Sequence, residues 1–286
     1  MEMALEVKNL NKAYPGFALK DLSFSLPCGS IMGLIGENGA GKTTILKAIL
    51  NLIHRDSGEI TLLGHRDGGL DNAIKAQIGV VFDESCFHDN LTLRHISTVM
   101  GGIYPNWDPA YFTRLTRQLS LPEGKPVKAL SKGMKTKLCI AAALAHRPRL
   151  LLLDEPTSGL DPIVREEILD LFMDFIQDER NAILLSSHIT SDLDKIADYV
   201  TFIHEGQVAL SDNKDELTGK MGILKCSEQA LPTLDRSQAL RLRKGQFSCE
   251  VLVRDKNAYR IHHPGAVVEP ATLEDIMLFY VRGRTL

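Results

Sequence analysis

The sequence predicts an α/β fold built on a mainly parallel sheet, and two observations support this. Short, continuous apolar runs occur at residues 31–35, 78–82, 150–153 and 182–185. Apolar runs of this length are typical of strands that are buried on both faces of a parallel sheet. Segments with helical periodicity separate these runs, so strands and helices are expected to alternate in a layered α/β domain.

The N-terminal part of the chain has a different strand pattern. The segments LEVKNL, LSFSLP and GEITLLG alternate apolar and polar residues, as strands with one buried face do. Pro-Gly and Gly-Glu turn signals separate them. We therefore expect an antiparallel β edge here.

A helical insertion is expected at about residues 87–145, where strand patterns disappear. Within it, the segment WDPAYFTRLTRQLSL begins a helix at Asp108 and Pro109. After Asp198, the segment YVTFIHEGQVALSD predicts a hairpin that turns at Glu205 and Gly206.

Residues 221–286 mix short strands with one amphipathic helix at 273–281. We expect this part to be a small α+β appendage to a main domain at residues 1–220. No internal repeat or low-complexity linker separates the two parts, so the boundary follows only from the change of pattern.

Composition limits the class of protein but not its chemistry. A chain of 286 residues can bury a full core, and the net charge of −3 gives no basis for a nucleic-acid partner. The five cysteines form no CxxC pair, which argues against a disulfide framework or a zinc site and fits a reducing cytoplasm. They are Cys28, Cys86, Cys139, Cys226 and Cys249.

The sequence contains no apolar run of the ~18 residues that a membrane-spanning helix needs. Its start, MEMALEVKNL, lacks the basic and then apolar pattern of a signal peptide. If the protein works at a membrane, we expect it to dock there through a partner.

A phosphate-binding loop is predicted directly after the first apolar run. The sequence GENGAGKT matches G-x-x-x-x-G-K-[ST] and precedes a helical stretch at residues 44–53. Glycines let backbone N–H groups converge on phosphate oxygens, Lys42 neutralises the β and γ oxygens, and Thr43 offers a hydroxyl to Mg²⁺. A tight glycine turn before a helix is the structural alternative, which the strand and helix on either side disfavour. The predicted nucleotide-binding residues here are Gly36, Glu37, Asn38, Gly39, Ala40, Gly41, Lys42, Thr43 and Thr44.

Two carboxylates follow the apolar run LLLL at residues 150–153. Ligands of an α/β sheet collect at the carboxyl ends of its strands, so Asp154 is expected beside Mg²⁺. Glu155 is then placed to polarise a water that attacks the γ-phosphate. Acidic residues after a strand can also cap the next helix, but the phosphate-binding loop favours the catalytic interpretation.

Over roughly residues 3–220, the chain resembles the nucleotide-binding domain of the ATP-binding cassette (ABC) family, a P-loop NTPase. The segment LSKGM at residues 130–134 resembles the family signature LSGGQ, and DEPTSGLD at 154–161 resembles its Walker B and D-loop. The sequence SSH ends at His188, which corresponds to the switch histidine. Tyr14 corresponds to the aromatic residue that stacks on adenine.

The resemblance implies a domain with an antiparallel β subdomain and a helical insertion. It also implies an ATPase that works as a head-to-tail dimer. Two cassettes would bury two ATP molecules, each held by the phosphate-binding loop of one subunit and by Ser131 and Gly133 of the other. Glu155 would activate water, His188 would contact the γ-phosphate, and Asp161 would communicate across the interface. Lys42 would complete the catalytic set.

Three positions depart from the family pattern. The family usually has a glutamine after the strand at residues 78–82, whereas this chain has Asp83. A carboxylate is shorter and adds negative charge, but it remains a suitable oxygen ligand for Mg²⁺. Lys132 and Met134 replace a glycine and a glutamine of the signature, while Ser131 and Gly133 are retained.

The resemblance also implies a membrane partner. In the family, the helical insertion helps form a groove for a cytoplasmic helix of the permease, and residues 87–104 are the corresponding stretch here. Its apolar residues suit either such a groove or the core, and they are Phe87, Leu91, Leu93, Ile96, Val99, Met100 and Ile103.

The single cassette with a small tail is most similar to bacterial ABC-2-type export subunits. The expected place of work is therefore the cytoplasmic face of the cell membrane, where the chain binds an integral permease. The second cassette can be an identical copy or a homologue.

Other functions stay open from the sequence. A soluble ABC protein of translation or DNA repair usually has two cassettes or a long coiled coil, and neither pattern is present. A nucleotide-gated binding module with little hydrolysis is favoured only by Asp83, and Glu155 and His188 argue against it. A small-molecule kinase has no need for the segments at 130–134 and 158–161.

Overall fold

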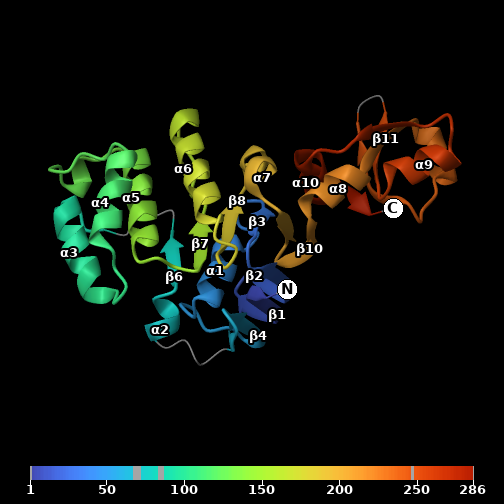
Figure 1. Cartoon of the computed structure of the whole chain (residues 1–286). Coiled ribbons are helices and arrows are strands. Elements are labelled where there is room, and N and C mark those ends of the chain that lie inside the picture. The colour runs from blue at the N-terminus through green and yellow to red at the C-terminus, as the bar shows by residue number, and fades with distance from the viewer. Residues whose placement is uncertain (1, 67–71, 83–86, 246–247, 286) are drawn as a thin grey trace.

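The computed structural model describes residues 2–66, 72–82, 87–245 and 248–285. Its central element is a six-stranded sheet in the order β10-β9-β3-β8-β7-β6 (Figure 1). All neighbouring strands in it are parallel except the β9–β10 hairpin, as the sequence predicted. The strands are β3 (Ile31–Gly36), β6 (Ile78–Val81), β7 (Leu150–Asp154), β8 (Ala182–Ser187), β9 (Tyr199–His204) and β10 (Gln207–Asn213).

Alternate residues of these strands supply two different cores. Leu151 and Leu153 of β7 pack in one core with helices α5, α6 and α7. Leu150 and Leu152 pack in the other core with helix α1 and the N-terminal strands. Because successive side chains of a strand point to opposite faces, a sheet covered on both sides needs the continuous apolar runs seen in the sequence. The helices are α1 (Lys42–Ile49), α5 (Lys132–Ala145), α6 (Pro162–Phe175) and α7 (Thr190–Ile196).

The N-terminal strands are antiparallel, but they do not form an edge of the central sheet. They make a separate four-stranded sheet in the order β2-β1-β4-β5, which is the expected antiparallel β subdomain. Its apolar face packs on α1, so this helix is held between the two sheets. The strands are β1 (Met3–Tyr14), β2 (Phe17–Pro27), β4 (Ser57–Leu62) and β5 (His65–Arg66).

The predicted helical insertion is present, and side chains define where its helices begin. Thr92 caps α3 in a capping box with His95, and Asp108 caps α4 with Pro109 as the first helical residue. The insertion contains α3 (Leu93–Ile103), α4 (Pro109–Gln118), the 3₁₀ turn η1 (Val127–Ala129) and α5; a short helix, α2 (Asn72–Lys75), precedes it.

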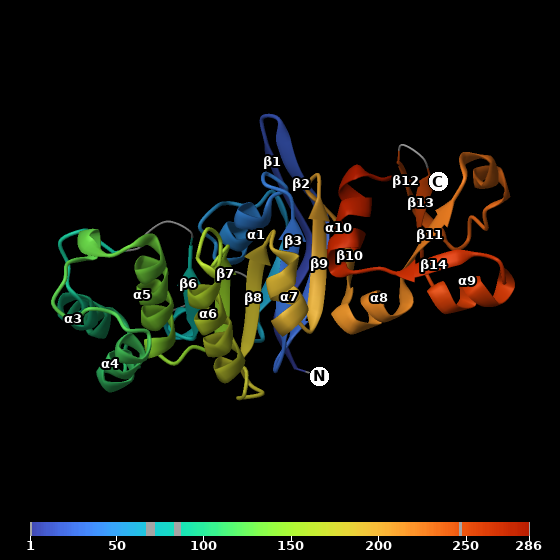
Figure 2. The same cartoon turned by 90° about the horizontal axis from the view of Figure 1, so that it is seen from above.

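The C-terminal part forms a third, five-stranded antiparallel sheet in the order β14-β11-β13-β12-β15. Helix α10 (Leu273–Arg282) joins this sheet to the central one, because Tyr280 packs against Phe202 of β9 with ring centroids 5.6 Å apart (Figure 2). The other elements are α8 (Lys214–Lys220), β11 (Gly222–Cys226), η2 (Glu228–Thr233), β12 (Ala239–Lys244), β13 (Cys249–Val253), α9 (Lys256–His262), β14 (Val267–Pro270) and β15 (Arg284–Thr285).

Among the helices of the described residues, none combines the length and the hydropathy of a membrane-spanning segment.

Candidate active site

The predicted catalytic segments meet at the carboxyl edge of the central sheet. The phosphate-binding loop follows β3, Glu155 follows β7, and His188 follows β8. These three strands are adjacent and parallel, so their carboxyl ends lie at the same edge. Ligands of open α/β sheets bind at this kind of edge.

Glycines give the phosphate-binding loop its shape. Gly39 and Gly41 have φ values of +85° and +110°, a region that other residues rarely adopt. A Cβ atom at Gly36 would lie 2.5 Å from the carbonyl oxygen of Ile203, so a larger residue does not fit there. The loop borders a pocket of about 240 Å³ lined by Phe17, Glu37, Asn38, Gly39, Gly41, Lys42, Thr43, Thr44 and Glu155.

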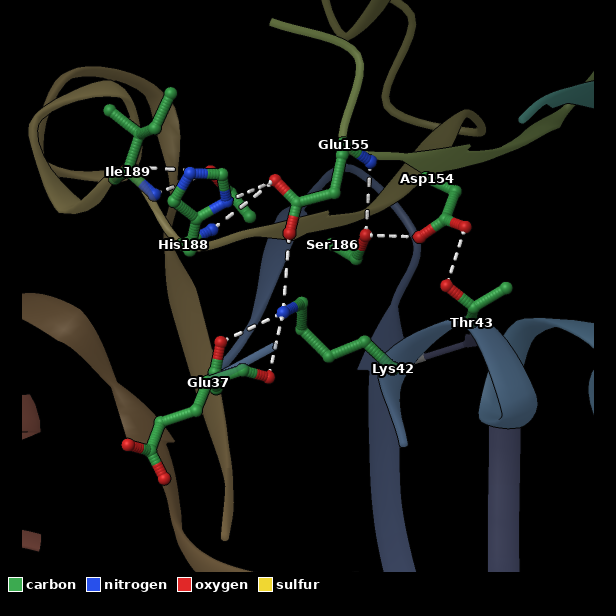
Figure 3. A network of polar contacts seen from close by, with 10 residues as sticks. Glu37, Lys42, Thr43, Asp154, Glu155, Ser186, His188 and Ile189 are labelled. Atoms are coloured by element: carbon green, nitrogen blue, oxygen red, sulfur yellow. Dashed lines mark hydrogen bonds and ion pairs between the residues drawn. The ribbon is translucent and has the colours of Figure 1, made fainter. Parts of the chain in front are cut away.

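Lys42 places a buried positive charge over this loop (Figure 3). Its Nζ donates hydrogen bonds to the carbonyl oxygens of Gly36 at 2.7 Å and Glu37 at 3.3 Å. It also lies 3.2 Å from Oε1 of Glu155. The ammonium group therefore stands between the loop and the acidic end of β7, where phosphate oxygens would be neutralised.

Asp154 is buried and connected to two hydroxyl groups. Thr43 Oγ1 donates to Asp154 Oδ2 at 2.7 Å, and Ser186 Oγ donates to Asp154 Oδ1 at 2.6 Å. A hydroxyl and a carboxylate this close are hard oxygen ligands of the kind that Mg²⁺ prefers. No group of three or more His, Cys, Asp or Glu residues suited to a metal ion occurs in the described part of the chain.

Sequence reasoning gave Ser186 no role, although it connects the two carboxylate residues. Besides its bond to Asp154, its Oγ accepts a hydrogen bond from the backbone N–H of Glu155 at 3.0 Å. The sequence feature that could have indicated this role is a small hydroxyl residue at the carboxyl end of a buried strand, two positions before His188. Asp83, the third predicted Mg²⁺ ligand, lies outside the described residues.

Glu155 connects Lys42 with His188. Its Oε2 lies 2.7 Å from His188 Nδ1 and 3.4 Å from the backbone N of His188. Its Oε1 is buried and lies 3.2 Å from the ammonium nitrogen of Lys42. The backbone of Glu155 has φ +49°, a strained conformation for a residue other than glycine.

The aromatic residue that borders the pocket is Phe17, not Tyr14. Tyr14 ends β1 with 43% of its surface exposed, and the Nζ of Lys12 lies 5.1 Å from its ring centroid. Phe17 follows in the next strand, and its Cζ would be 2.8 Å from a Cβ at Gly41. The sequence signal for Phe17 was its position directly after the Pro15-Gly16 turn, whereas the adenine-stacking role of Tyr14 stays a prediction.

Ser131, Gly133 and Asp161 are not among the residues that line this pocket. Ser131 caps α5 by accepting a hydrogen bond from Met134 N, and Asp161 caps α6 by accepting one from Val164 N at 3.0 Å. A Cβ at Gly133 would lie 3.6 Å from Val164, so the starts of α5 and α6 are neighbours. Within one chain, the signature segment and the phosphate-binding loop are therefore separate sites.

A second, more apolar pocket of about 490 Å³ lies where the central sheet meets the helical insertion. It is lined by Leu50, Asn51, Leu52, Lys75, Ile78, Val80, Phe82 and Tyr104. Of the apolar residues that suit either a partner groove or the core, Leu93 and Ile96 belong to the core. Phe87, Leu91 and Met100 are partly buried against the same core, whereas Val99 and Ile103 are exposed.

Comparisons with known proteins identify the family of this chain. The family model described as "ABC transporter" matches residues 19–158. The ABC transporter ATP-binding protein YtrB of Bacillus subtilis is 33% identical over 74% of this chain and 73% of its own length. The lantibiotic transport ATP-binding protein SrtF of Streptococcus pyogenes is 35% identical over 74% of this chain and 95% of its own.

The similarity to one relative extends beyond the cassette. The bacitracin transport ATP-binding protein BcrA of Bacillus licheniformis is 32% identical over 93% of this chain and 85% of its own length. A solved "ATP binding subunit of ABC transporter" is 29% identical, with a TM-score of 0.68 over 76% of this chain and 92% of that structure. A dimeric cassette bound to ADP and Pi shares the fold, with a TM-score of 0.65 at 21% identity over 73% of this chain and 98% of that structure.

Proposed function

Because this chain belongs to the ABC transporter family, as an ATP-hydrolysing subunit that powers transport, we propose that Lys42, Glu155 and His188 form its catalytic centre. The observation that carries this proposal is the position of the Glu155 carboxylate between the other two side chains, at 3.2 Å and 2.7 Å. Such a carboxylate can accept a proton from an attacking water while the lysine neutralises the γ-phosphate.

The remaining residues of the site have binding roles in this proposal. The backbone N–H groups of residues 36–44 hold the phosphates of ATP, and Thr43 and Asp154 hold Mg²⁺, with Asp83 as a further candidate ligand. The ion neutralises charge on the β and γ oxygens when it is bound. Ser186 fixes Asp154 and the backbone of Glu155 relative to each other. Tyr14 stacks on adenine.

The separation of the signature segment from the phosphate-binding loop supports a two-chain site. Ser131 lies at the N-terminal end of α5, where a helix favours an anion, yet it does not border the pocket of its own chain. We assign Ser131, Gly133 and Asp161 to the ATP that is bound by a second ABC subunit. Pairing of the two subunits about a two-fold axis would complete both ATP sites.

The apolar pocket between the sheet and the helical insertion is the proposed docking site for a short cytoplasmic helix of an integral permease. Exposed apolar residues in this region support the assignment, with Leu52 at 61% and Ile103 at 63% exposure. Two of the three named relatives are a lantibiotic and a bacitracin transport ATP-binding protein, which favours peptide export. The chain would then work at the cytoplasmic face of the cell membrane, without a nucleic-acid partner.

Residues 221–286 would form an appendage to the cassette at 1–220.

The variant Glu155→Gln tests the catalytic centre and the two-chain site together. It should bind ATP but release phosphate at least about 100-fold more slowly than the wild type, because the amide cannot accept the proton of the water. Light scattering after size exclusion should give the 31.7 kDa mass of one chain without ATP and twice that mass with ATP. The matched control adds Ser131→Arg, which should leave ATP binding intact and abolish the shift in mass.

Each result has a definite meaning. A wild-type chain that binds ATP without hydrolysing it, alone and with its permease, would contradict the ATPase proposal and support a nucleotide-gated binding module. A Glu155→Gln chain that binds ATP but stays monomeric would contradict self-association. It would indicate that the second cassette is a different chain.

A further inference from the structure

Two cysteines lie opposite each other in the sheet of the C-terminal appendage. Strand β11 ends at Cys226 and strand β13 begins at Cys249. The two strands are neighbours in this sheet (Figure 2), and their antiparallel register pairs these two residues. Both are free cysteines. They lie far apart in the sequence and form no short motif, so only the fold brings them together.

The geometry of this pair suits a disulfide bond. Paired residues of antiparallel strands have Cα atoms about 4.5 or 5.5 Å apart and side chains on the same face of the sheet. Disulfides span Cα distances of about 4.4–6.8 Å, so the bond would require little movement of either strand. Both side chains pack in one apolar cluster, in which Cys249 is buried and Cys226 is half-buried.

The two thiols differ in exposure, which sets the order in which they can react. A small disulfide can reach the half-buried Cys226, whereas the buried Cys249 can attack only a sulfur that is held beside it. Burial and the neighbouring Cys249 raise the pKa of the Cys226 thiol, so little thiolate is present at neutral pH and exchange is slow. We expect such a pair to stay reduced in a reducing cytoplasm and to react when disulfides accumulate.

We propose that Cys226 and Cys249 form a reversible disulfide, with a low-molecular-weight disulfide such as glutathione disulfide as the oxidant. The Cys226 thiolate attacks one sulfur of the oxidant, which forms a mixed disulfide and releases one thiolate. The Cys249 thiolate then attacks Sγ of Cys226 and expels the second thiolate. The two cysteines lose two protons and two electrons, which the two released small thiols carry. The proposal goes beyond the ATPase function and does not depend on it.

The bond would close a loop that contains β12. Arg241 of this strand lies over the ring of Tyr280 in α10, with its guanidinium carbon 4.9 Å from the ring centroid. The same ring packs against Phe202 of the central sheet. A disulfide restricts residues 227–248 in the unfolded chain, so the oxidised appendage should resist unfolding more strongly than the reduced one.

The test equilibrates the full chain with one glutathione and glutathione disulfide buffer, in native conditions and in denaturant. The remaining thiols are then blocked and the tryptic peptides are mapped. In native conditions the wild type should yield residues 226–236 linked to residues 245–254, and dithiothreitol should separate them. The ratio of linked peptides to mixed disulfides should be at least about 10-fold higher in native conditions, because a bond that stabilises the fold is favoured by the fold to the same extent.

Two variants provide the controls. Cys249→Ser should carry a mixed disulfide at Cys226, and its denaturant midpoint should not rise on oxidation as that of the wild type does. Cys28→Ser is the matched control, because Cys28 is also half-buried and burial also raises the pKa of its thiol. Cys28 follows the end of β2 and is not paired with a cysteine in the described strands, so its removal should leave the linked peptides unchanged.

Linked peptides that form at the same ratio in native and denaturing conditions, or only in denaturant, overturn the proposal, since the fold would not favour the bond. A disulfide to Cys86, which lies outside the described residues, in place of this pair overturns it as well. The comparison of native with denatured wild type needs no substitution, so it decides the question even if Cys249→Ser folds poorly.

Discussion

His188 Nδ1 lies 2.7 Å from Glu155 Oε2, although 32 residues separate the two positions in the chain. The contact exists because β7 and β8 are adjacent parallel strands that end side by side. The left-handed backbone at Glu155, which costs on the order of 1–3 kcal/mol, contributes to its direction. Strain of this kind is retained where the surrounding structure imposes it, and it is common at active sites.

Replacing His188 with alanine should slow hydrolysis more than it weakens ATP binding. The imidazole orients the Glu155 carboxylate, so its loss should lower kcat about 100-fold or more with KM within about threefold. Steady-state phosphate release measures both values. His65→Ala, at an exposed position of β5, is the control and should behave as the wild type. A comparable loss of kcat and of ATP affinity would show that His188 acts mainly in binding.

Lys42→Ala should abolish most of the ATP affinity. The substitution removes a buried ammonium group that makes charge-assisted contacts, each contributing about 1.5–3 kcal/mol, so Kd should rise about 10-fold to 150-fold. Isothermal titration with ATP measures the change. Lys47→Ala provides a control on the same helix, because Lys47 is exposed and does not line the pocket. An unchanged Kd for Lys42→Ala would remove the lysine from the proposed site.

Ser186→Ala should weaken the response to Mg²⁺ as well as the fold. The change removes the hydrogen bonds from Oγ to Asp154 and from Glu155 N to Oγ, at a cost of about 1–3 kcal/mol in the free energy of unfolding. A less fixed Asp154 should raise the Mg²⁺ concentration for half-maximal hydrolysis. Ser187→Ala serves as the control, because Ser187 hydrogen-bonds to the backbone of Ile189 instead. Equal Mg²⁺ requirements in both variants would refute a role for Ser186 at the metal.

His146 should make the protein less stable in mild acid. The ring is buried against Tyr104, with centroids 4.1 Å apart, and burial lowers its pKa below the usual 6.5. The unfolded chain therefore takes up a proton first as the pH falls, so stability is lost below pH 6.5 until the folded pKa is reached. This group changes the free energy of unfolding by at most about 1.4 kcal/mol per pH unit.

Denaturant unfolding at pH 7.5, 6.5 and 5.5 measures this dependence. His146→Gln keeps a hydrogen-bonding side chain near Ile78 but cannot titrate, so the wild type should lose more stability than the variant between pH 6.5 and 5.5. Parallel pH profiles for the two proteins would exclude His146 as the source.

Gly206→Ala should destabilise the fold much more than Gly16→Ala. Both glycines have positive φ, at +73° and +82°. A Cβ at Gly206 would lie 1.9 Å from the Ala18 carbonyl oxygen, whereas nothing lies within 4 Å of one at Gly16. We expect about 1 kcal/mol from the backbone conformation alone at Gly16 and at least about 2 kcal/mol at Gly206. Denaturant unfolding compares them, and equal losses would show that the β9–β10 turn moves away from β2 without cost.

The sequence was informative wherever local chemistry decided the structure. The continuous apolar run at 150–153 predicted a strand covered on both faces, and Glu205-Gly206 predicted the turn of the hairpin because the two-residue turn needs positive φ at both positions. Asp108 and Pro109 likewise marked the start of α4. The sequence did not predict which N-terminal strands pair, because the pairing between β1 and β4 joins residues far apart in the chain.

By itself, the sequence determined the family, the order of the motifs and the residue types that can bind a nucleotide, since these depend on composition and spacing along the chain. Only the tertiary structure decided that Ser186 connects Asp154 to Glu155, that Phe17 borders the pocket, and that Cys226 lies opposite Cys249. These contacts depend on the distances between side chains on different strands and helices. Those distances follow from the packing of the whole core on both faces of the central sheet.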